Sequence, residues 1–201
     1  MVQSMSFNAL FDFESALAEY TGAPYVVLTD CCTHALELCF RHDGIKKTAF
    51  TPFTYLSIPM LMQHLGVDYQ YHNQDHRQYT WTGEYHFEGT RIWDSARRLE
   101  PGMYKKGFMQ CLSFGWTKPL QLGKVGAILL DDHEAYKKFS RQRSDGRDLN
   151  IPWEKETDLI LGYHYCPTLE LCVKGLELLS TVEPKSQPGI YPDCRKIKFN
   201  P

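Results

Sequence analysis

Long apolar runs and an excess of charge are both missing from this 201-residue sequence. No run approaches the roughly 20 apolar residues of a membrane-spanning helix, and the N-terminus lacks the charged-then-apolar pattern of a signal peptide. The 22 basic and 24 acidic residues leave a formal net charge of −2, which gives no broad electrostatic surface for nucleic acid or lipid. We therefore predict a cytoplasmic protein that binds neither a membrane nor nucleic acid.

Paired cysteine motifs are also missing. The seven cysteines are scattered, odd in number and without CxxC spacing, so we expect buried, reduced thiols and no zinc site. His72 and His76 lie in a polar, loop-like stretch where no metal is expected either. The turn at 30–33 contains no glycine, which argues against a dinucleotide-binding Rossmann domain.

Hydrophobic periodicity then indicates the fold class. Helical spacing predicts helices at 11–20, 34–41, 57–65, 133–143 and 168–181. Short apolar or alternating runs predict strands at 25–29, 48–51, 67–71, 84–87, 90–93, 110–114 and 125–130. Strands that alternate with helices are typical of an α/β domain with a mostly parallel sheet.

Ligands of such sheets bind beyond the carboxyl ends of the strands, where Thr33, Tyr55, Asp94 and Lys118 are expected. The turn at 30–33 would present free N–H groups at a helix N-terminus, which suits a phosphate. A plain helix cap by Thr33 or Asp30 is the alternative. Lys118 with Asp94 fits a Schiff-base lysine and its pyridinium partner, although a loop lysine is usually only solvated.

The motifs in this order resemble the DegT/StrS family of sugar aminotransferases, which are fold-type-I pyridoxal-phosphate enzymes. The resemblance runs from about 13 to about 182 and includes CCTHAL, PFTY, DSAR, SFGWTKPL, KVGAILLDD and GYHYCPTLELCVKGLELL. It implies a three-layer α/β/α large domain at 1–182, in a shortened form without the small C-terminal domain. The segment 183–201 would be a tail that drapes over the surface or a partner.

The resemblance also implies roles for individual residues. Lys118 would form the internal aldimine with pyridoxal 5'-phosphate and shuttle the proton, while Asp94 would pair with the pyridine nitrogen. Tyr55 would stack on the ring, unless it is only a core aromatic. The remaining cofactor-binding residues would be Cys32, Thr33 and Ser113 at the phosphate, Arg97 at the phenolic oxygen, and His164 reaching the phosphate from the other subunit of a homodimer.

Several residues depart from the family pattern. Cys32 stands in place of a glycine, Arg97 in place of a glutamine and Cys166 in place of an arginine. The stretch between Tyr71 and Thr90 is shorter than in the family, as if a strand–helix unit were missing.

The resemblance implies an aminotransferase that moves an amino group from glutamate to a nucleotide-linked keto sugar. The presence of Lys118 disfavours the dehydratase branch of the family, in which histidine replaces it. A first alternative is a shortened homologue that binds pyridoxal phosphate, or nothing, and acts as a partner subunit or regulator. A second is a thiol enzyme using Cys31 or Cys32, although His34 is expected to point along its helix, away from the turn.

Overall fold

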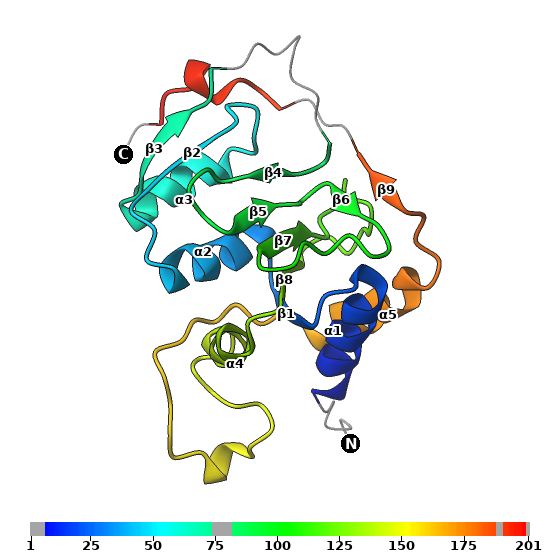
Figure 1. Cartoon of the computed structure of the whole chain (residues 1–201). Coiled ribbons are helices and arrows are strands. Elements are labelled where there is room, and N and C mark those ends of the chain that lie inside the picture. Colours follow the sequence, from blue (N-terminus) through cyan, green and yellow to red (C-terminus); the bar gives the residue numbers. More distant parts are fainter. Residues whose placement is uncertain (1–6, 74–81, 188–190, 200–201) are drawn as a thin grey trace.

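A five-stranded sheet forms the centre of the protein in the computed structural model, which describes residues 7–73, 82–187 and 191–199. Figure 1 shows this sheet between two groups of helices. In spatial order the strands are β1 (Tyr25–Thr29), β8 (Gly126–Leu130), β7 (Met109–Ser113), β5 (Ile92–Asp94) and β4 (Tyr85–His86).

Two smaller strand pairs extend this framework. The parallel strands β2 (Lys47–Phe50) and β3 (Asp68–Tyr71) join the sheet beyond β4 through an isolated bridge between Ala49 and Glu88. The short strands β6 (Arg98–Leu99) and β9 (Lys185–Ser186) pair with each other and bring the tail back to the sheet. Two short 3-10 helices, η1 (Trp153–Lys155) and η2 (Cys194–Lys196), complete the elements.

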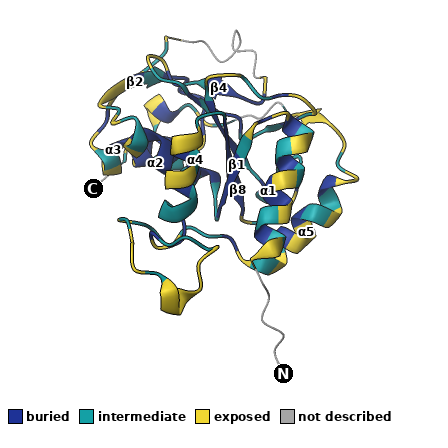
Figure 2. Ribbon diagram, turned by 60° about the horizontal axis from the view of Figure 1, so that its bottom comes forward, coloured by how far each residue is buried: buried dark blue, intermediate teal, exposed yellow. Residues whose placement is uncertain are grey.

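Helices cover both faces of the sheet. The helices α1 (Asn8–Thr21) and α5 (Leu169–Leu179) pack on one face. The helices α2 (Cys32–His42), α3 (Ser57–Leu65) and α4 (His133–Gln142) pack on the other. Figure 2 shows the buried sides of α1 and α5 facing the strands and their exposed sides facing outward.

The alternation of strand side chains explains the two apolar cores. In β1, Val26 and Leu28 belong to the core under α1 and α5, whereas Val27 belongs to the core under α2. Both cores are continuous across the sheet because β7 and β8 alternate in the same way. The predicted α/β class and three layers are therefore confirmed, and each predicted helix or strand lies within three residues of an observed one.

The sheet contains more antiparallel pairs than the sequence predicted. Within it, β5 and β7 form the parallel pair, while β4 runs against β5, and β8 runs against both β1 and β7. The reason is the connections, because only 87–91 separate β4 from β5 and no helix lies in 114–125 between β7 and β8. A parallel neighbour would need a crossover, usually through a helix.

A buried ion pair fastens α1, β1 and the end of α4 together. The fully buried Arg143 donates from its guanidinium to the carboxylate of Glu14 and to the carbonyl of Leu28 at 2.9 Å. The same carboxylate accepts the backbone N–H of Leu28 at 2.7 Å. Each charge is thus hydrogen-bonded as well as paired, which burial requires.

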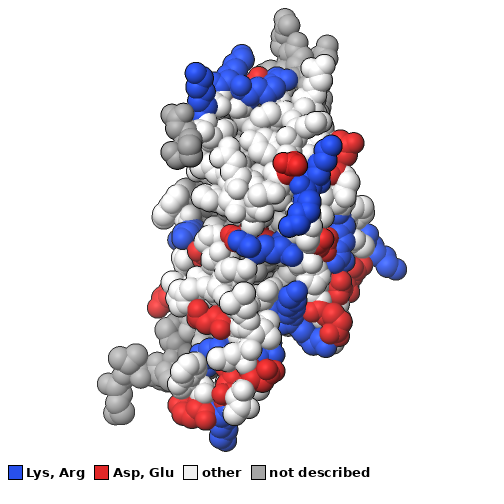
Figure 3. All heavy atoms as spheres, turned by 90° about the vertical axis from the view of Figure 1, so that its left-hand side faces the viewer, with Lys and Arg blue, Asp and Glu red and all other residues white. Residues whose placement is uncertain are grey.

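On the side that Figure 3 shows, basic and acidic side chains alternate over the lower part, and several basic side chains gather near the top. Among the described residues, no helix has both the length and the apolar character needed to cross a membrane.

Breaking the buried pair should destabilise the protein strongly. We expect Arg143→Met or Glu14→Gln to lower the free energy of unfolding by about 3–5 kcal/mol, because each leaves a buried polar group without its partner. Urea unfolding followed by circular dichroism measures this. Lys137→Met is the matched control, since its ion pair with Glu134 lies on the surface and is worth about 0–1 kcal/mol. Single-variant losses no larger than that of the control would contradict the prediction.

Candidate active site

A pocket of about 370 Å³ opens at the carboxyl ends of β1, β5 and β7. Seven of the eight predicted cofactor residues line its wall. They are Cys32, Thr33, Tyr55, Asp94, Arg97, Ser113 and Lys118. The exception is His164, whose side chain is 89% exposed and whose Nδ1 atom lies 3.0 Å from Asp145. The structure therefore brings together residues that are up to 86 positions apart, from Cys32 to Lys118 (118 − 32), as expected for strand ends at one edge.

One end of the pocket is the first turn of α2. The preceding residue, Cys31, has an extended backbone (φ −160°, ψ 161°), after which the N–H groups of the helix begin. The hydroxyl groups of Thr33 and Ser57 lie 2.8 Å apart beside this turn. Hydroxyls and free N–H groups at a helix N-terminus suit an anion.

The position of this turn is fixed by Gly126 of β8. A Cβ atom on Gly126 would lie 2.5 Å from the backbone nitrogen of Cys32, so only glycine allows the strand to pass this close. The Cys32 side chain, which replaces the family glycine, packs into the core beneath α2. Burial raises the pKa of the Cys32 thiol well above its usual range, so the thiol stays neutral.

Asp94 lies in the wall at the end of β5 and is 4% exposed. One carboxylate oxygen accepts the N–H of Ala96 at 2.9 Å, and the other accepts the hydroxyl of Tyr85 at 3.0 Å. Burial raises the pKa of Asp94, against the opposing effects of the Ala96 N–H, the charge of Lys118 and the Tyr85 hydroxyl. In the described part of the chain this carboxylate has no ion-pair partner within 4.0 Å.

Lys118 reaches the pocket from a tight turn after β7. Its backbone N–H donates to the carbonyl of Gly115 at 3.1 Å, and Gly115 bridges Gly123 across the same loop. The loop is therefore closed on itself, and it holds the lysine on a short segment next to Ser113. Its ammonium group donates to the hydroxyl of Tyr191 at 3.1 Å.

Tyr191 is a pocket residue that the sequence analysis missed. It belongs to the C-terminal tail and lies between β9 (Lys185–Ser186) and η2 (Cys194–Lys196) in the sequence. The tail is tied down on one side by Gln187, whose N–H donates to the carbonyl of Arg97 at 2.8 Å. On the other side the N–H of Cys194 donates to Pro52 at 3.0 Å. No sequence motif marks a tail aromatic as part of a site, so only the fold could find it.

Arg97 is engaged by this tail. Its Nε donates to the carbonyl of Gln187 at 3.2 Å, and its guanidinium carbon lies 5.7 Å from the centre of the Tyr191 ring. The Tyr55 ring is 59% exposed and meets the same tyrosine edge-on, with ring centres 6.2 Å apart. Tyr55 is thus a pocket-wall aromatic and not a core residue.

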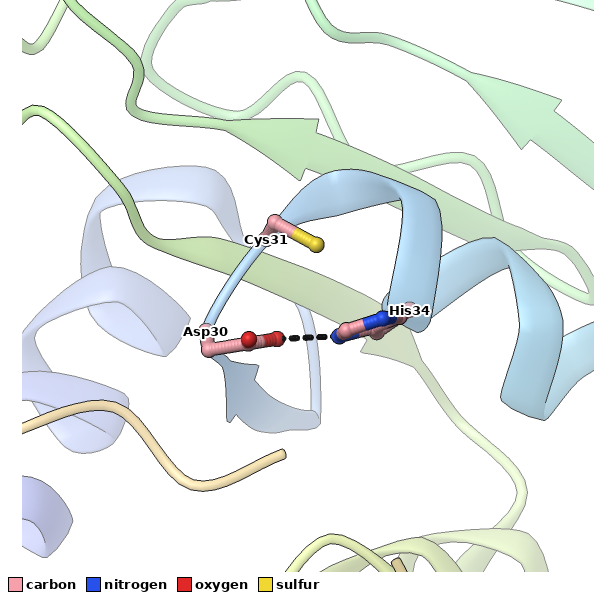
Figure 4. Close-up of side chains that lie close together, drawn as sticks. All are labelled: Asp30, Cys31 and His34. Atoms are coloured by element: carbon pink, nitrogen blue, oxygen red, sulfur yellow. Dashed lines mark hydrogen bonds and ion pairs between the residues drawn. The ribbon is translucent and has the colours of Figure 1, made fainter. Parts of the chain in front are cut away.

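The expected direction of His34 was wrong. Figure 4 shows its ring turned back toward Asp30, with Cys31 beside them, and the Nδ1 to Oδ1 distance is 2.6 Å. Helical side chains lean toward the N-terminus, so a residue in the first turn reaches the end of the preceding strand. The ring also stacks on Tyr165, with centres 3.8 Å apart. The hydrogen bonds to Asp30 and then Cys31 raise the pKa of His34 to about 10.

The donor set fits pyridoxal phosphate. The phosphate would meet the N–H groups and hydroxyls at α2, and the ring nitrogen would meet the carboxylate of Asp94. A volume of about 370 Å³ falls within the roughly 300–1,000 Å³ range of small-molecule sites. The missing counter-ion of Asp94 is the strongest sign of fit, because a protonated pyridine nitrogen would supply one.

The fold is shared with solved structures of pyridoxal-phosphate-dependent and sugar aminotransferases. AtS13 from Actinomadura melliaura shares the fold with a TM-score of 0.69 and 20% identity, over 88% of this chain and 61% of that chain. The sugar aminotransferase CalS13 from Micromonospora echinospora gives 0.67 and 17%, over 86% and 61%. PseC from Helicobacter pylori, an aminotransferase of pseudaminic acid biosynthesis, gives 0.67 and 15%, over 86% and 57%.

Residues 4–84 match the model of the DegT/DnrJ/EryC1/StrS aminotransferase family, which confirms the resemblance predicted from the motifs. The chain spans about three fifths of the length of the solved structures it matches. No curated protein matches the sequence. His76, one of the two histidines considered above, lies outside the described residues.

The charge of His34 should make stability depend on pH. Its folded pKa of about 10 exceeds the ordinary value of 6.5, so its contribution is fully present below pH 6.5. That contribution is lost as the pH rises through about 10. We therefore expect the wild-type protein to be more stable than His34→Gln at pH 6, with the gap shrinking toward pH 10.5. Urea unfolding of both proteins across this range measures the gap, and a gap independent of pH would contradict the prediction.

Proposed function

We propose that this protein is a pyridoxal-phosphate-dependent aminotransferase that moves an amino group from glutamate to a nucleotide-linked keto sugar. One observation carries the proposal: a lysine amino group shares a pocket with a buried carboxylate that has no counter-ion among the described residues. The names of similar structures support the substrate class, since one was solved with its TDP-sugar product and another is a sugar aminotransferase. The described cysteines are all free, which fits a cytoplasmic location.

In this proposal the two ends of the pocket hold the cofactor. Thr33, Ser113 and the N–H of Cys32 would hold the phosphate, and Asp94 would hold the protonated ring nitrogen. When bound, the cofactor supplies an electron sink for the bond being broken at the amino-bearing carbon. Asp94 keeps that sink effective because its buried charge favours the protonated ring. Tyr55 would cover one face of the ring.

Lys118 would hold the cofactor covalently and, in both half-reactions, shuttle the proton between the substrate carbon and the cofactor. Both tasks need the amine without its proton. The lysine nitrogen donates to the hydroxyl of Tyr191 at 3.1 Å, which fixes where the side chain lies. Tyr191 would therefore position the lysine. Arg97, with its guanidinium near the same tyrosine, would contribute charge at this edge of the pocket.

The test is an absorbance titration with pyridoxal phosphate. We expect wild-type protein to develop a visible band of lysine-bound cofactor that bleaches when glutamate is added. Lys118→Ala should lose the band, while the matched variant Lys137→Ala, a surface lysine of α4, should keep it. Asp94→Asn should bind the cofactor roughly 30-fold more weakly, since it removes about 2 kcal/mol or more of buried charge pairing.

Two other results of this titration would argue against an aminotransferase. A band that does not respond to glutamate would favour the alternative reading, a cofactor-binding partner subunit or regulator without transfer activity. A protein that gives no band would overturn the proposal.

We also propose that the active form is a homodimer with His164 serving the partner's pocket. The support is a loop with large exposed apolar side chains, including Trp153 at 63%, Leu159 at 55% and Leu161 at 85%. This loop leads directly to His164, which is itself exposed. Large apolar side chains gathered at the surface often mark an interface between chains.

Light scattering on a size-exclusion column should therefore give twice the monomer mass. Leu161→Glu should shift the protein toward the monomer, because it puts a charge into the apolar contact. His164→Ala should leave the mass unchanged and weaken cofactor binding. A monomeric wild-type protein would contradict this assembly, and so would a His164→Ala variant that binds the cofactor as tightly as the wild type.

A further inference from the structure

A cluster of possible metal ligands, Asp30, Cys31 and His34, lies beside the cofactor pocket, and Cys31 also lines that pocket (Figure 4). Asp30 follows β1, Cys31 precedes α2, and His34 lies in the first turn of that helix. Their carboxylate, thiol and imidazole donor atoms all lie within 4.8 Å of one another. The side chains of His34 and Asp30 are 30% and 19% exposed, so an ion from solvent can reach them.

The cluster is held in place by its surroundings. The His34 ring stacks on Tyr165 at an angle of 10°, and the N–H of Asp30 donates to the carbonyl of Tyr165 at 2.7 Å. The second oxygen of Asp30 accepts an ion pair from Lys124 at 3.2 Å. Lys124 is 68% exposed and can turn away without a large cost. The three donors are thus preorganised, and the competing cation is loosely held.

We propose that Asp30, Cys31 and His34 bind a divalent ion of the zinc class, with a fourth position open to solvent. Zinc prefers a set of carboxylate, thiolate and imidazole ligands, whereas magnesium and calcium prefer oxygens alone. A tetrahedral ion about 2.0 Å from its oxygen and nitrogen ligands places them roughly 3.3 Å apart. The His34 and Asp30 atoms lie 2.6 Å apart with a hydrogen between them, so a small rotation lets the metal replace that hydrogen.

Metal ligands bind as thiolate and neutral imidazole, so metal binding is coupled to proton release. In the absence of metal, the imidazole of His34 and the carboxylate of Asp30 share a hydrogen bond of 2.6 Å. A bound ion would replace that hydrogen and become the cation beside Asp30. Two other groups lie near the cluster. Lys124 would be repelled by the ion, and the Tyr165 hydroxyl donates a hydrogen bond to Glu37. Affinity should therefore rise with pH.

Cobalt is the probe, because Co²⁺ replaces zinc and reports its ligands in the visible and near-ultraviolet spectrum. Titrating the purified protein, without pyridoxal phosphate, should produce tetrahedral bands and a thiolate charge-transfer band, with release of protons as the ion binds. Cys31→Ser should remove the thiolate band. His34→Gln and Asp30→Asn should each weaken binding roughly 10-fold or more, as losses of single ligands do.

Matched controls separate this site from the other thiols and imidazoles. Cys166→Ser and His64→Gln remove a partly buried cysteine and an exposed histidine outside the cluster, so both should keep the wild-type titration. Absence of a thiolate band would overturn the proposal, and so would a band that survives Cys31→Ser. A second test needs no variant and therefore holds even if the variants fail to fold. In the wild-type protein, zinc should protect Cys31 from alkylation, which peptide mapping measures. Equal alkylation with and without zinc would also overturn it.

Discussion

The buried carboxylate of Asp94 imposes the main electrostatic requirement of this structure. A charge that is 4% exposed costs several kcal/mol in lost hydration unless hydrogen bonds and an opposite charge offset it. Tyr85 and the backbone of Ala96 supply hydrogen bonds but no charge. The Tyr85 hydroxyl is itself fixed by Thr54 at 2.6 Å, so the carboxylate is held rigidly before any ligand arrives. The desolvation cost of Asp94 is already part of the folded state, so a ligand that places a cation beside this carboxylate gains electrostatic binding energy without adding to that cost.

The first turn of α2 is the second fixed point, and it contributes to both the pocket and the cluster beside it. Toward the pocket it presents N–H groups and the Thr33 hydroxyl. Beside the pocket it carries Cys31 and His34 next to Asp30, and Cys31 lines the pocket as well. Gly126 packs directly against this turn, so a larger residue at position 126 would displace it. Positive charge in this cluster, from His34 and Lys124 or from a metal, favours an anion at the same helix end, and the linkage is reciprocal.

The sequence predicted the parts of the site that depend on local pattern and strand ends. Asp94, Ser113 and Lys118 were found because each follows or ends a recognisable strand, and the parallel pair β5–β7 brings those ends to one edge. The antiparallel placement of β4 and β8 was not foreseen, since strand patterns carry no direction. The orientation of His34 back toward Asp30 was also missed. Periodicity gives the face of a helix on which a residue lies, but not the direction in which its side chain points along the helix. Tyr191 had no local signal at all, as its contact with Lys118 spans 73 residues.

That long-range contact shapes what Lys118 can do. The ammonium group lies 3.1 Å from the Tyr191 hydroxyl and 5.8 Å from the centre of its ring, so the tail occupies one side of the lysine. The tail is held on both flanks, by Arg97 with Gln187 and by Pro52 with Cys194. Lys118 must give up the tyrosine hydrogen bond to reach a ligand on the Asp94 side, at a net cost of about 1 kcal/mol.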